Sequence, residues 1–163
     1  MNKFVTMILL VFSVIMNGQE TKKILFIGNS LTYFNDMTQT FEAIANSKLD
    51  ATEVTRHSPG GRWFEDHVND EFVYEKFREK IWDFVVLQPG GSEAYGVSVP
   101  IAQTLTHAKR LKDSILKYSP CAKILYYEIS NGVWGSNPDD IQAYNDSMDL
   151  VRSNFEYLAD STE

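Results

Sequence analysis

The segment from Lys22 to Tyr33 constrains the fold of this chain more than any other. It reads K-K-I-L-F-I-G-N-S-L-T-Y, in which the apolar run Ile24 to Ile27 is too short for a helix and rich in residues that favour strands. The run ends at Gly28 and is followed at once by the polar residues Asn29 and Ser30. This pattern predicts a buried strand that ends in a tight turn.

A turn that follows such a strand is a favourable place for chemistry. In open α/β proteins, ligands bind outside the carboxyl ends of the parallel strands. Loops held there by a rigid sheet often carry catalytic side chains. Ser30 is therefore our candidate nucleophile.

Predicted strands and helices alternate along the rest of the chain, which is typical of a parallel sheet with helices on both faces. We expect a three-layer α/β/α domain of flavodoxin-like type, with its strands in the order 2-1-3-4. A helix is predicted over Thr38 to Lys48, and shorter helical pieces over Arg62 to Lys80. The four parallel strands are expected near residues 23–27, 53–57, 83–88 and 123–128.

Two later helices are predicted from their capping residues. Ser98 can cap a helix whose apolar residues recur at helical spacing. Asn137 can cap a second helix, with Pro138 at its first position and two acidic residues in its first turn. The apolar stripe expected on the first helix comprises Ile101, Leu105, Ala108, Leu111 and Ile115.

The composition indicates one globular domain and argues against nucleic-acid binding. Of 163 residues, 44% are hydrophobic and 23% charged, which is sufficient for a sizeable core. The formal net charge is -7, and no basic cluster occurs outside Lys22-Lys23, so no positive surface for a phosphate backbone is expected. Cys121 is the single cysteine and cannot form an internal disulfide; its apolar neighbours predict that it is buried.

Residues 1–18 are interpreted as a secretory signal peptide, and residues 19–163 as one domain. Lys3 gives a positive start, and Val5 to Met16 is mainly apolar. The alternative is a membrane anchor, but roughly 20 apolar residues are needed to span a bilayer and this run is shorter. We therefore expect the mature chain in the periplasm or outside the cell, free of the membrane after cleavage.

Three blocks of the sequence resemble the SGNH (GDSL-type) hydrolases. Gly28-Asn29-Ser30-Leu31, directly after the first strand, is similar to the first block of that family, with Asn29 where aspartate is commoner. Gly60-Gly61 follows the second strand and is similar to the second block. Val85 to Ser92 stands where the third block follows the third strand, with Gln88 in the place of its usual asparagine.

This resemblance implies a serine ester hydrolase. Ser30 would attack the ester carbonyl, and the oxyanion would be stabilised by the amide of Ser30, by an amide of Gly60 or Gly61, and by the side-chain amide of Gln88. We expect no metal site and no cofactor. The G-x-S-x-G motif of the α/β-hydrolase elbow does not occur in the sequence.

The histidine base of that family is not evident. The resemblance implies a histidine three residues after an aspartate in a C-terminal loop, but the sequence contains no Asp-x-x-His. His107 falls within a predicted helix, His67 follows the glycine pair, and His57 ends the second strand, where it could share a rim with Ser30. We expect the base to be absent from this chain, with His57 as the alternative. Because the sequence ends at Glu163, before any fifth strand, it is interpreted as the N-terminal portion of an esterase or as a non-catalytic relative.

Two functions of different class follow. The first is a secreted serine esterase that acts on a small or carbohydrate-linked ester. The second is a non-catalytic module on the same fold that binds a ligand such as a carbohydrate. A phosphate-binding protein fits less well, because the first loop has too few Ser, Thr and Gly amides to cradle a phosphate. In both cases ligand contact is expected from Asn29 and from the loop aromatics Tyr33, Trp63, Tyr95 and Trp134.

Overall fold

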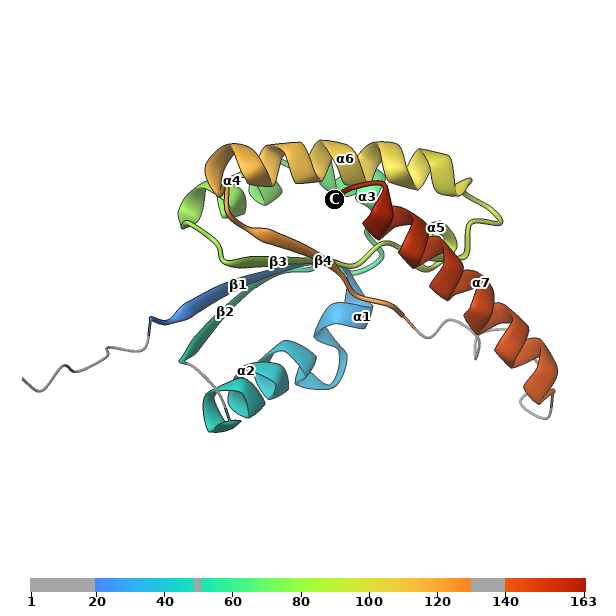
Figure 1. The fold of residues 1–163 in the computed structure, drawn as a ribbon, viewed down its shortest axis with the longest axis horizontal. Coiled ribbons are helices and arrows are strands. Elements are labelled where there is room, and N and C mark those ends of the chain that lie inside the picture. Colours follow the sequence, from blue (N-terminus) through green and yellow to red (C-terminus); the bar gives the residue numbers. More distant parts are fainter. Residues whose placement is uncertain (1–19, 49–50, 130–139) are drawn as a thin grey trace, which may run out of the picture.

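A parallel sheet of four strands, flanked by helices on both faces, forms the centre of the molecule (Figure 1). The structure is a computed structural model that describes residues 20–48, 51–129 and 140–163. The strand order is β2-β1-β3-β4, as predicted from the sequence. The elements are β1 (Lys22–Ile27), α1 (Ser30–Tyr33), the 3-10 helix η1 (Phe34–Asp36), α2 (Met37–Lys48), β2 (Thr52–His57), α3 (Phe64–His67), α4 (Glu71–Glu79), β3 (Phe84–Leu87), α5 (Gly91–Tyr95), α6 (Ile101–Tyr118), β4 (Lys123–Tyr126) and α7 (Ile141–Asp160).

The register of the strands brings their carboxyl ends to one edge of the sheet. Ile27, the last residue of β1, lies opposite His57 of β2 and Leu87 of β3. Leu87 in turn lies opposite Tyr126, the last residue of β4. The loop that carries Ser30 therefore starts between the loops that follow β2 and β3.

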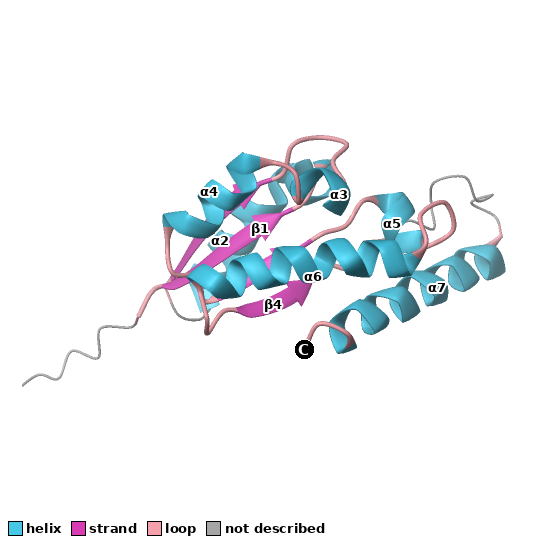
Figure 2. Cartoon of the chain, turned by 90° about the horizontal axis from the view of Figure 1, so that it is seen from above, coloured by secondary structure: helices cyan, strands magenta, loops and turns pink. Residues whose placement is uncertain are grey.

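The larger part of the core lies between the sheet and the layer formed by α3, α4 and α6. Viewed from above, α6 runs along the sheet with α4 beside it (Figure 2). Fully burying a Val, Leu, Ile, Phe or Met side chain stabilises a fold by about 1.5–3 kcal/mol. Four of the five residues of the predicted stripe on α6 are buried, and Ile101 is partly buried against them. The largest buried side chains of this cluster are Leu25, Ile27, Phe64, Phe77, Trp82, Leu87, Leu111, Ile115 and Leu158.

The opposite face of the sheet is covered by α2. Phe26 of β1 packs edge to face against Phe41 of α2, with ring centroids 5.6 Å apart. At the far end of the molecule, α7 packs against α5 through a second apolar cluster that includes Ala94, Val151 and Phe155. Asn154 Nδ2 also donates hydrogen bonds to the carbonyl groups of Ala94, at 2.9 Å, and Tyr95, at 3.0 Å. No helix among the described residues is long and apolar enough to cross a membrane.

Three local predictions differ from the structure. Helix α6 begins at Ile101 after Pro100, so Ser98 is not its cap. Helix α7 begins at Ile141 and is capped by Asp140, whose carboxylate accepts a hydrogen bond from the Ala143 amide; the predicted cap Asn137 lies outside the described residues. Cys121 is exposed and not buried, because it lies in the turn before β4 and its apolar neighbours belong to the strand.

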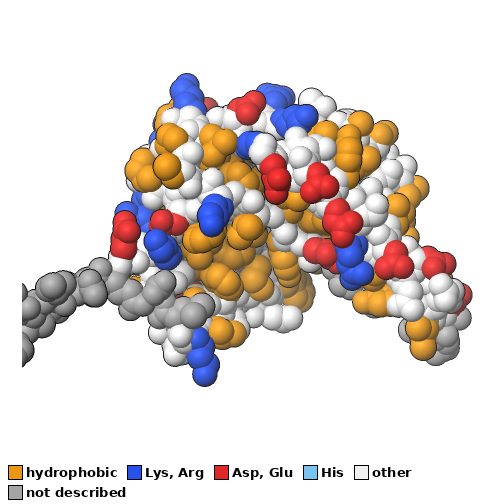
Figure 3. All heavy atoms as spheres, viewed as in Figure 1, with side chains coloured by type: hydrophobic (Ala, Val, Ile, Leu, Met, Phe, Trp, Pro, Cys, Tyr) orange, Lys and Arg blue, Asp and Glu red, His pale blue; other side chains and the backbone are white. Residues whose placement is uncertain are grey.

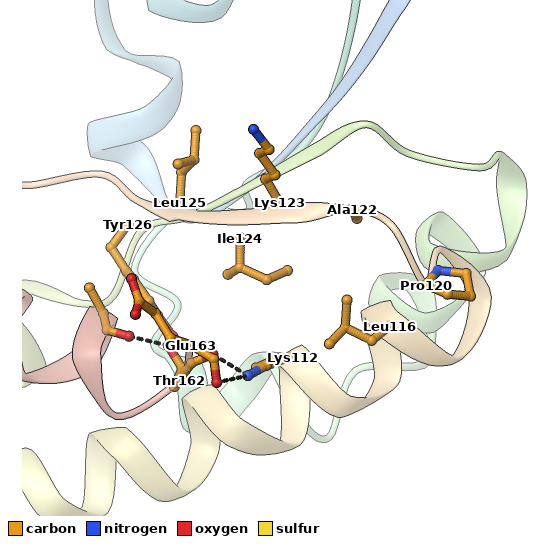
Figure 4. Close-up of a pocket in the computed structure, with 11 residues that line it drawn as sticks. Lys112, Leu116, Pro120, Ala122, Lys123, Ile124, Leu125, Tyr126, Thr162 and Glu163 are labelled. Carbon is orange, nitrogen blue, oxygen red and sulfur yellow. Dashed lines mark hydrogen bonds between the residues drawn. The ribbon is translucent and has the colours of Figure 1, made fainter.

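Strand β4 forms one edge of the described sheet and has an exposed face. Hydrophobic side chains gather in the middle of the surface on this side of the molecule (Figure 3). Leu125 and Lys123 point to one side of β4, and Ile124 points to the other, toward α6 (Figure 4). A groove of about 570 Å³ lies on the α6 side, where Lys112 Nζ donates hydrogen bonds to the carbonyl groups of Thr162 and Glu163.

Candidate active site

Ser30 opens helix α1 directly after the turn that ends β1. Asn29 caps the helix in an extended conformation, and its Oδ1 accepts a hydrogen bond of 3.1 Å from the Leu31 amide. The Ser30 side chain is half-buried, and its hydroxyl makes no hydrogen bond with any residue that the structure describes. Ser30 therefore lies at the carboxyl edge of the sheet.

Gln88 supports this turn from the neighbouring strand. It is 1% exposed, and its Oε1 accepts hydrogen bonds of 2.9 Å from the Asn29 amide and from Thr32 Oγ1. Because a backbone amide can only donate, these contacts fix the orientation of the side chain, and Nε2 donates to the Pro89 carbonyl. Gln88 thus lies beside the Ser30 turn, with its amide nitrogen bonded within the protein.

The loop of Gly60 and Gly61 is tied to the same turn. Asn29 Nδ2 donates a hydrogen bond of 2.8 Å to the Arg62 carbonyl, one residue beyond the glycine pair. Gly61 has a φ of 70°, a backbone conformation that glycine adopts without strain. Gly60 lies against α1, since a Cβ atom added to it would be 3.3 Å from the Tyr33 hydroxyl. The first two predicted blocks are therefore adjacent, as expected.

Trp63 and Glu93 connect this loop with the one that follows β3. The Trp63 indole packs so closely on Gly90 that an added Cβ atom would lie 2.2 Å from its Cδ1. The buried Glu93 carboxylate accepts hydrogen bonds from the Phe64 amide at 2.9 and 3.0 Å and from the Gly90 amide at 2.8 Å. Burial raises the pKa of Glu93, and these hydrogen bonds oppose the rise.

Sequence reasoning missed Glu93, although a signal for it exists. A glutamate three residues after a helix cap is the spacing of a capping box, and Glu93 stands three residues after Gly90. The pattern would have predicted the contact with Gly90. It contains no information about Phe64, because that contact depends on how two distant loops meet.

The remaining aromatic candidates are more dispersed. Tyr33 is 38% exposed, and the Arg56 guanidinium lies over its ring at 5.6 Å from the centroid. Trp63 is 37% exposed beside the glycine loop. The Tyr95 hydroxyl is paired with Ser147 Oγ of α7 at 2.7 Å, so its polar end is already bound within the protein. Trp134 lies outside the described residues.

None of the three histidines is hydrogen-bonded to Ser30. His57 Nε2 lies 3.0 Å from Asp70 Oδ2, and His67 Nε2 lies 2.9 Å from the Gly28 carbonyl. Burial lowers the pKa of His67 from 6.5 to about 4, so this ring is neutral at pH 7. His107 is on α6 and has a buried Nδ1 with no hydrogen-bond partner in the described structure.

Solved structures that share this fold include proteins described as hydrolases and esterases. A protein from Slackia heliotrinireducens that is assigned to the SGNH hydrolases is 20% identical, with a TM-score of 0.69 over 88% of this chain and 76% of its own. A DUF4886 family protein from Bacteroides uniformis is 14% identical, with a TM-score of 0.64 over 88% of this chain and 64% of its own, which is less than two thirds of its length. A variant of Axe2, an acetyl-xylooligosaccharide esterase from Geobacillus, is 15% identical, with a TM-score of 0.56 over 86% of this chain and 73% of its own.

The chain therefore has the α/β fold of the SGNH and GDSL-type hydrolases. No family model matches the sequence, and no curated protein sequence matches it significantly. At these levels of identity the similarity establishes the fold. The chemistry has to be argued from the site itself.

Proposed function

We propose that this protein is a serine ester hydrolase in which Ser30 is the nucleophile. The observation that carries the proposal is the place of Ser30 in the fold: it opens α1 directly after β1, and the preceding residue, Asn29, is hydrogen-bonded to Arg62 beside the Gly60-Gly61 loop. The hydroxyl oxygen attacks the ester carbonyl, the alcohol leaves, and water then releases the acid from the acyl-enzyme. The amide of Ser30 and an amide of Gly60 or Gly61 donate to the oxyanion that forms during each step.

Gln88 and Asn29 act in this proposal by holding the site together. Both side chains are buried, and each has its oxygen and its nitrogen bonded to protein groups. Gln88 Nε2 would have to leave the Pro89 carbonyl before it could turn toward an oxyanion. We therefore assign Gln88 to the support of the Ser30 turn, in place of the oxyanion role expected from the sequence, and Asn29 to the link between the turn and the glycine loop.

The general base is, in our proposal, not among the three histidines of this sequence. None of them is hydrogen-bonded to Ser30 in the described structure, and His107 lies on α6. A serine protease that has lost one member of its triad keeps a rate only about 10³–10⁴ above that in water, through its oxyanion hole and binding. We therefore expect the 163-residue chain alone to be nearly inactive.

We propose a small or carbohydrate-linked ester as the substrate. Trp63 and Tyr33 are partly exposed beside the glycine loop, where an aromatic face can stack on a sugar ring or an acyl group. An esterase of the same fold, Axe2, is described as acting on acetylated xylooligosaccharides. The reading of residues 1–18 as a signal peptide, and hence a periplasmic or extracellular location, belongs to the same proposal.

Labelling with an alkyl fluorophosphonate tests the nucleophile. Added imidazole serves as an external base, and the labelled peptide is identified by mass spectrometry in the wild type and in Ser30→Ala. We expect imidazole to promote labelling of the wild type at Ser30, and Ser30→Ala to remain unlabelled. Labelling only at other serines, or none with imidazole present, would exclude Ser30 as the nucleophile.

A non-catalytic binding module is the second candidate. It is favoured by the lack of any hydrogen bond between Ser30 and a histidine in the described structure. Titration with acetylated xylooligosaccharides, followed by calorimetry, tests this function. Saturable binding by a chain that fluorophosphonate does not label at Ser30 would establish the module and exclude the hydrolase.

A further inference from the structure

Three side chains to which the proposed reaction assigns no catalytic role converge near the Ser30 turn. One ring nitrogen each of His57 and His67 and one carboxylate oxygen of Asp70 all lie within 4.8 Å of one another. The three residues come from different elements: His57 ends β2, His67 ends α3, and Asp70 caps α4. A group that gathers two imidazoles and a carboxylate has the donors that bind transition metals.

His67 is in the chemical state of a metal ligand. The Gly28 carbonyl can only accept, so Nε2 carries the proton of the ring, and Nδ1 keeps its lone pair. His67 is fully buried, and Nδ1 has no hydrogen-bond partner in the described structure, which is uncommon for a buried polar atom. Metal-bound histidines commonly donate their second ring N–H to a backbone carbonyl, as His67 does to Gly28.

His57 and Asp70 form the accessible side of the cluster. Their side chains are 17% and 24% exposed, and His57 Nε2 is 3.0 Å from Asp70 Oδ2. The other carboxylate oxygen of Asp70 accepts a hydrogen bond of 3.0 Å from the Phe72 amide and so caps α4. This cap fixes the direction of the carboxylate and leaves Oδ2 toward the histidines.

A cavity borders the cluster and is lined by two of its three residues. It has a volume of about 600 Å³ and is lined by His57 and Asp70 together with the acidic residues Glu65 and Asp66. Among the described residues of its wall there are three carboxylates and one guanidinium, that of Arg62. Carboxylates in excess of cationic groups around a cavity raise the local concentration of cations.

We propose that His57, His67 and Asp70 bind one divalent transition-metal ion, with Zn²⁺ as the best fit. Two nitrogen donors and one carboxylate suit Zn²⁺ better than Mg²⁺ or Ca²⁺, which prefer oxygen ligands. Zn–N and Zn–O bonds are about 2.0–2.2 Å long, so the most distant pair of ligand atoms has to approach by a small side-chain rotation. Since His57 and Asp70 line the cavity, a fourth ligand such as water would reach the ion from that side. This proposal revises the sequence-based expectation of no metal site and does not depend on the hydrolase.

Direct binding to tag-free, chelator-stripped protein tests the proposal. Isothermal titration with Zn²⁺ gives the affinity and the stoichiometry, and titration with Co²⁺ gives a visible spectrum that depends on coordination. We expect one ion per chain and, because the site keeps three protein ligands and one open position, the intense visible bands of four-coordinate Co²⁺.

Asp70→Asn is the decisive variant, and Asp66→Asn is its matched control. Asparagine can keep the cap of α4 and a hydrogen bond to His57, but it removes the carboxylate ligand. Removing a residue that only hydrogen-bonds to a metal ligand weakens metal binding about 10–100-fold. Asp70 is itself a ligand in this proposal, so we expect Asp70→Asn to weaken Zn²⁺ binding by at least about 100-fold. Asp66 lines the same cavity and accepts a hydrogen bond from the Trp63 amide, which asparagine can also accept. Asp66→Asn removes the same charge but no ligand, so it should weaken Zn²⁺ binding far less than Asp70→Asn does.

A second ligand variant keeps the test valid if Asp70→Asn does not fold. His57→Gln should lose Zn²⁺ to a similar extent, and circular dichroism without metal should show that each variant is folded. Wild-type protein that binds no Zn²⁺, or that binds it with the same affinity as folded Asp70→Asn and His57→Gln, would overturn the proposal.

Discussion

Gln88 and His67 stabilise the Ser30 turn through buried hydrogen bonds to its backbone. Gln88 accepts from the Asn29 amide, and His67 donates to the Gly28 carbonyl. A buried polar group left without its partner costs about 1–3 kcal/mol, so each side chain stabilises one conformation of the turn. The backbone conformation just before Ser30 therefore depends on two buried polar side chains.

The pKa of His67 predicts a loss of stability in acid. Burial lowers it from 6.5 to about 4, so between these pH values the unfolded chain binds a proton that the folded chain does not. The stabilisation is complete above pH 6.5 and is lost as the pH falls to about 4. With 1.36 kcal/mol per pKa unit, the free energy of unfolding should fall by about 3 kcal/mol through this residue. Urea denaturation at pH 6.5 and at about pH 4, with a chelator present, measures this change in the free energy of unfolding.

His67→Gln is the comparison that isolates this effect. Glutamine keeps a donor for the Gly28 carbonyl but does not titrate. Glu93 acts in the opposite direction: because its pKa is raised, the free energy of unfolding falls as the pH rises above 4.5. Both proteins contain Glu93, so its contribution cancels when the pH dependence of the variant is subtracted from that of the wild type. An equal loss of stability in acid for wild type and variant would show that His67 is not the group concerned.

In the turn between β1 and α1, the side chains of Thr32 and Gln88 pack closely against Gly28. A Cβ atom added there would lie 2.2 Å from Thr32 Oγ1 and 2.7 Å from Gln88 Oε1. We expect Gly28→Ala to lower the free energy of unfolding by about 1–3 kcal/mol, as in other overpacked sites, because the two side chains have to move apart. Urea denaturation measures the change.

Gly60→Ala is the matched control for this element. Gly60 is exposed, and an added Cβ atom would meet only the Tyr33 hydroxyl, at 3.3 Å. Its effect on stability should be within about 0.5 kcal/mol, as for most surface substitutions. Equal losses for the two variants would contradict the packing described for the Ser30 turn.

The strands and their order could be predicted from the sequence because both depend on local patterns. The apolar run before Gly28 and the run Phe84–Leu87 are short, rich in strand formers and bounded by polar or glycine turns. Alternation with helices then implies parallel strands, and the register places the loops after them at one edge. Ser30, Asn29 and Gln88 were expected at this edge, and they are found together there.

The remaining features depend on contacts between distant segments or on competition at helix ends. Ser98 is a good cap by type, but the helix starts after Pro100, which fixes φ near a helical value at that position. The orientation of the Gln88 amide was not predictable, because it is decided by the Asn29 amide, 59 residues earlier. The approach of His57, His67 and Asp70 likewise requires the packing of three elements.

At the scale of the whole molecule, the exposed face of β4 predicts self-association. Leu125 is 47% exposed on an edge strand of the described sheet, and unpaired strand edges pair readily with other chains. The formal charge of -7 opposes association at low salt and is screened at physiological salt. We expect a concentration-dependent dimer or larger species by analytical ultracentrifugation in physiological salt, and a shift toward monomer in Leu125→Lys.

Val97→Lys provides the control for charge. Val97 is 69% exposed in the loop before α6, so this variant changes the net charge equally but leaves β4 unaltered. It should associate as the wild type does. Association that is unchanged in Leu125→Lys, or reduced equally in Val97→Lys, would rule out the β4 edge as the contact.

Hydrolysis of p-nitrophenyl acetate with and without imidazole tests most directly whether Ser30 is a nucleophile that lacks its base in this chain. Wild type and Ser30→Ala should have equal rates without imidazole. With imidazole, the wild type should become faster than Ser30→Ala, because the external base activates the serine hydroxyl beside the oxyanion donors. Equal rates under both conditions would contradict the role of Ser30. Ser30-dependent turnover without imidazole would show that the chain contains its own base, and loss of that turnover in His57→Ala would identify His57 as the base.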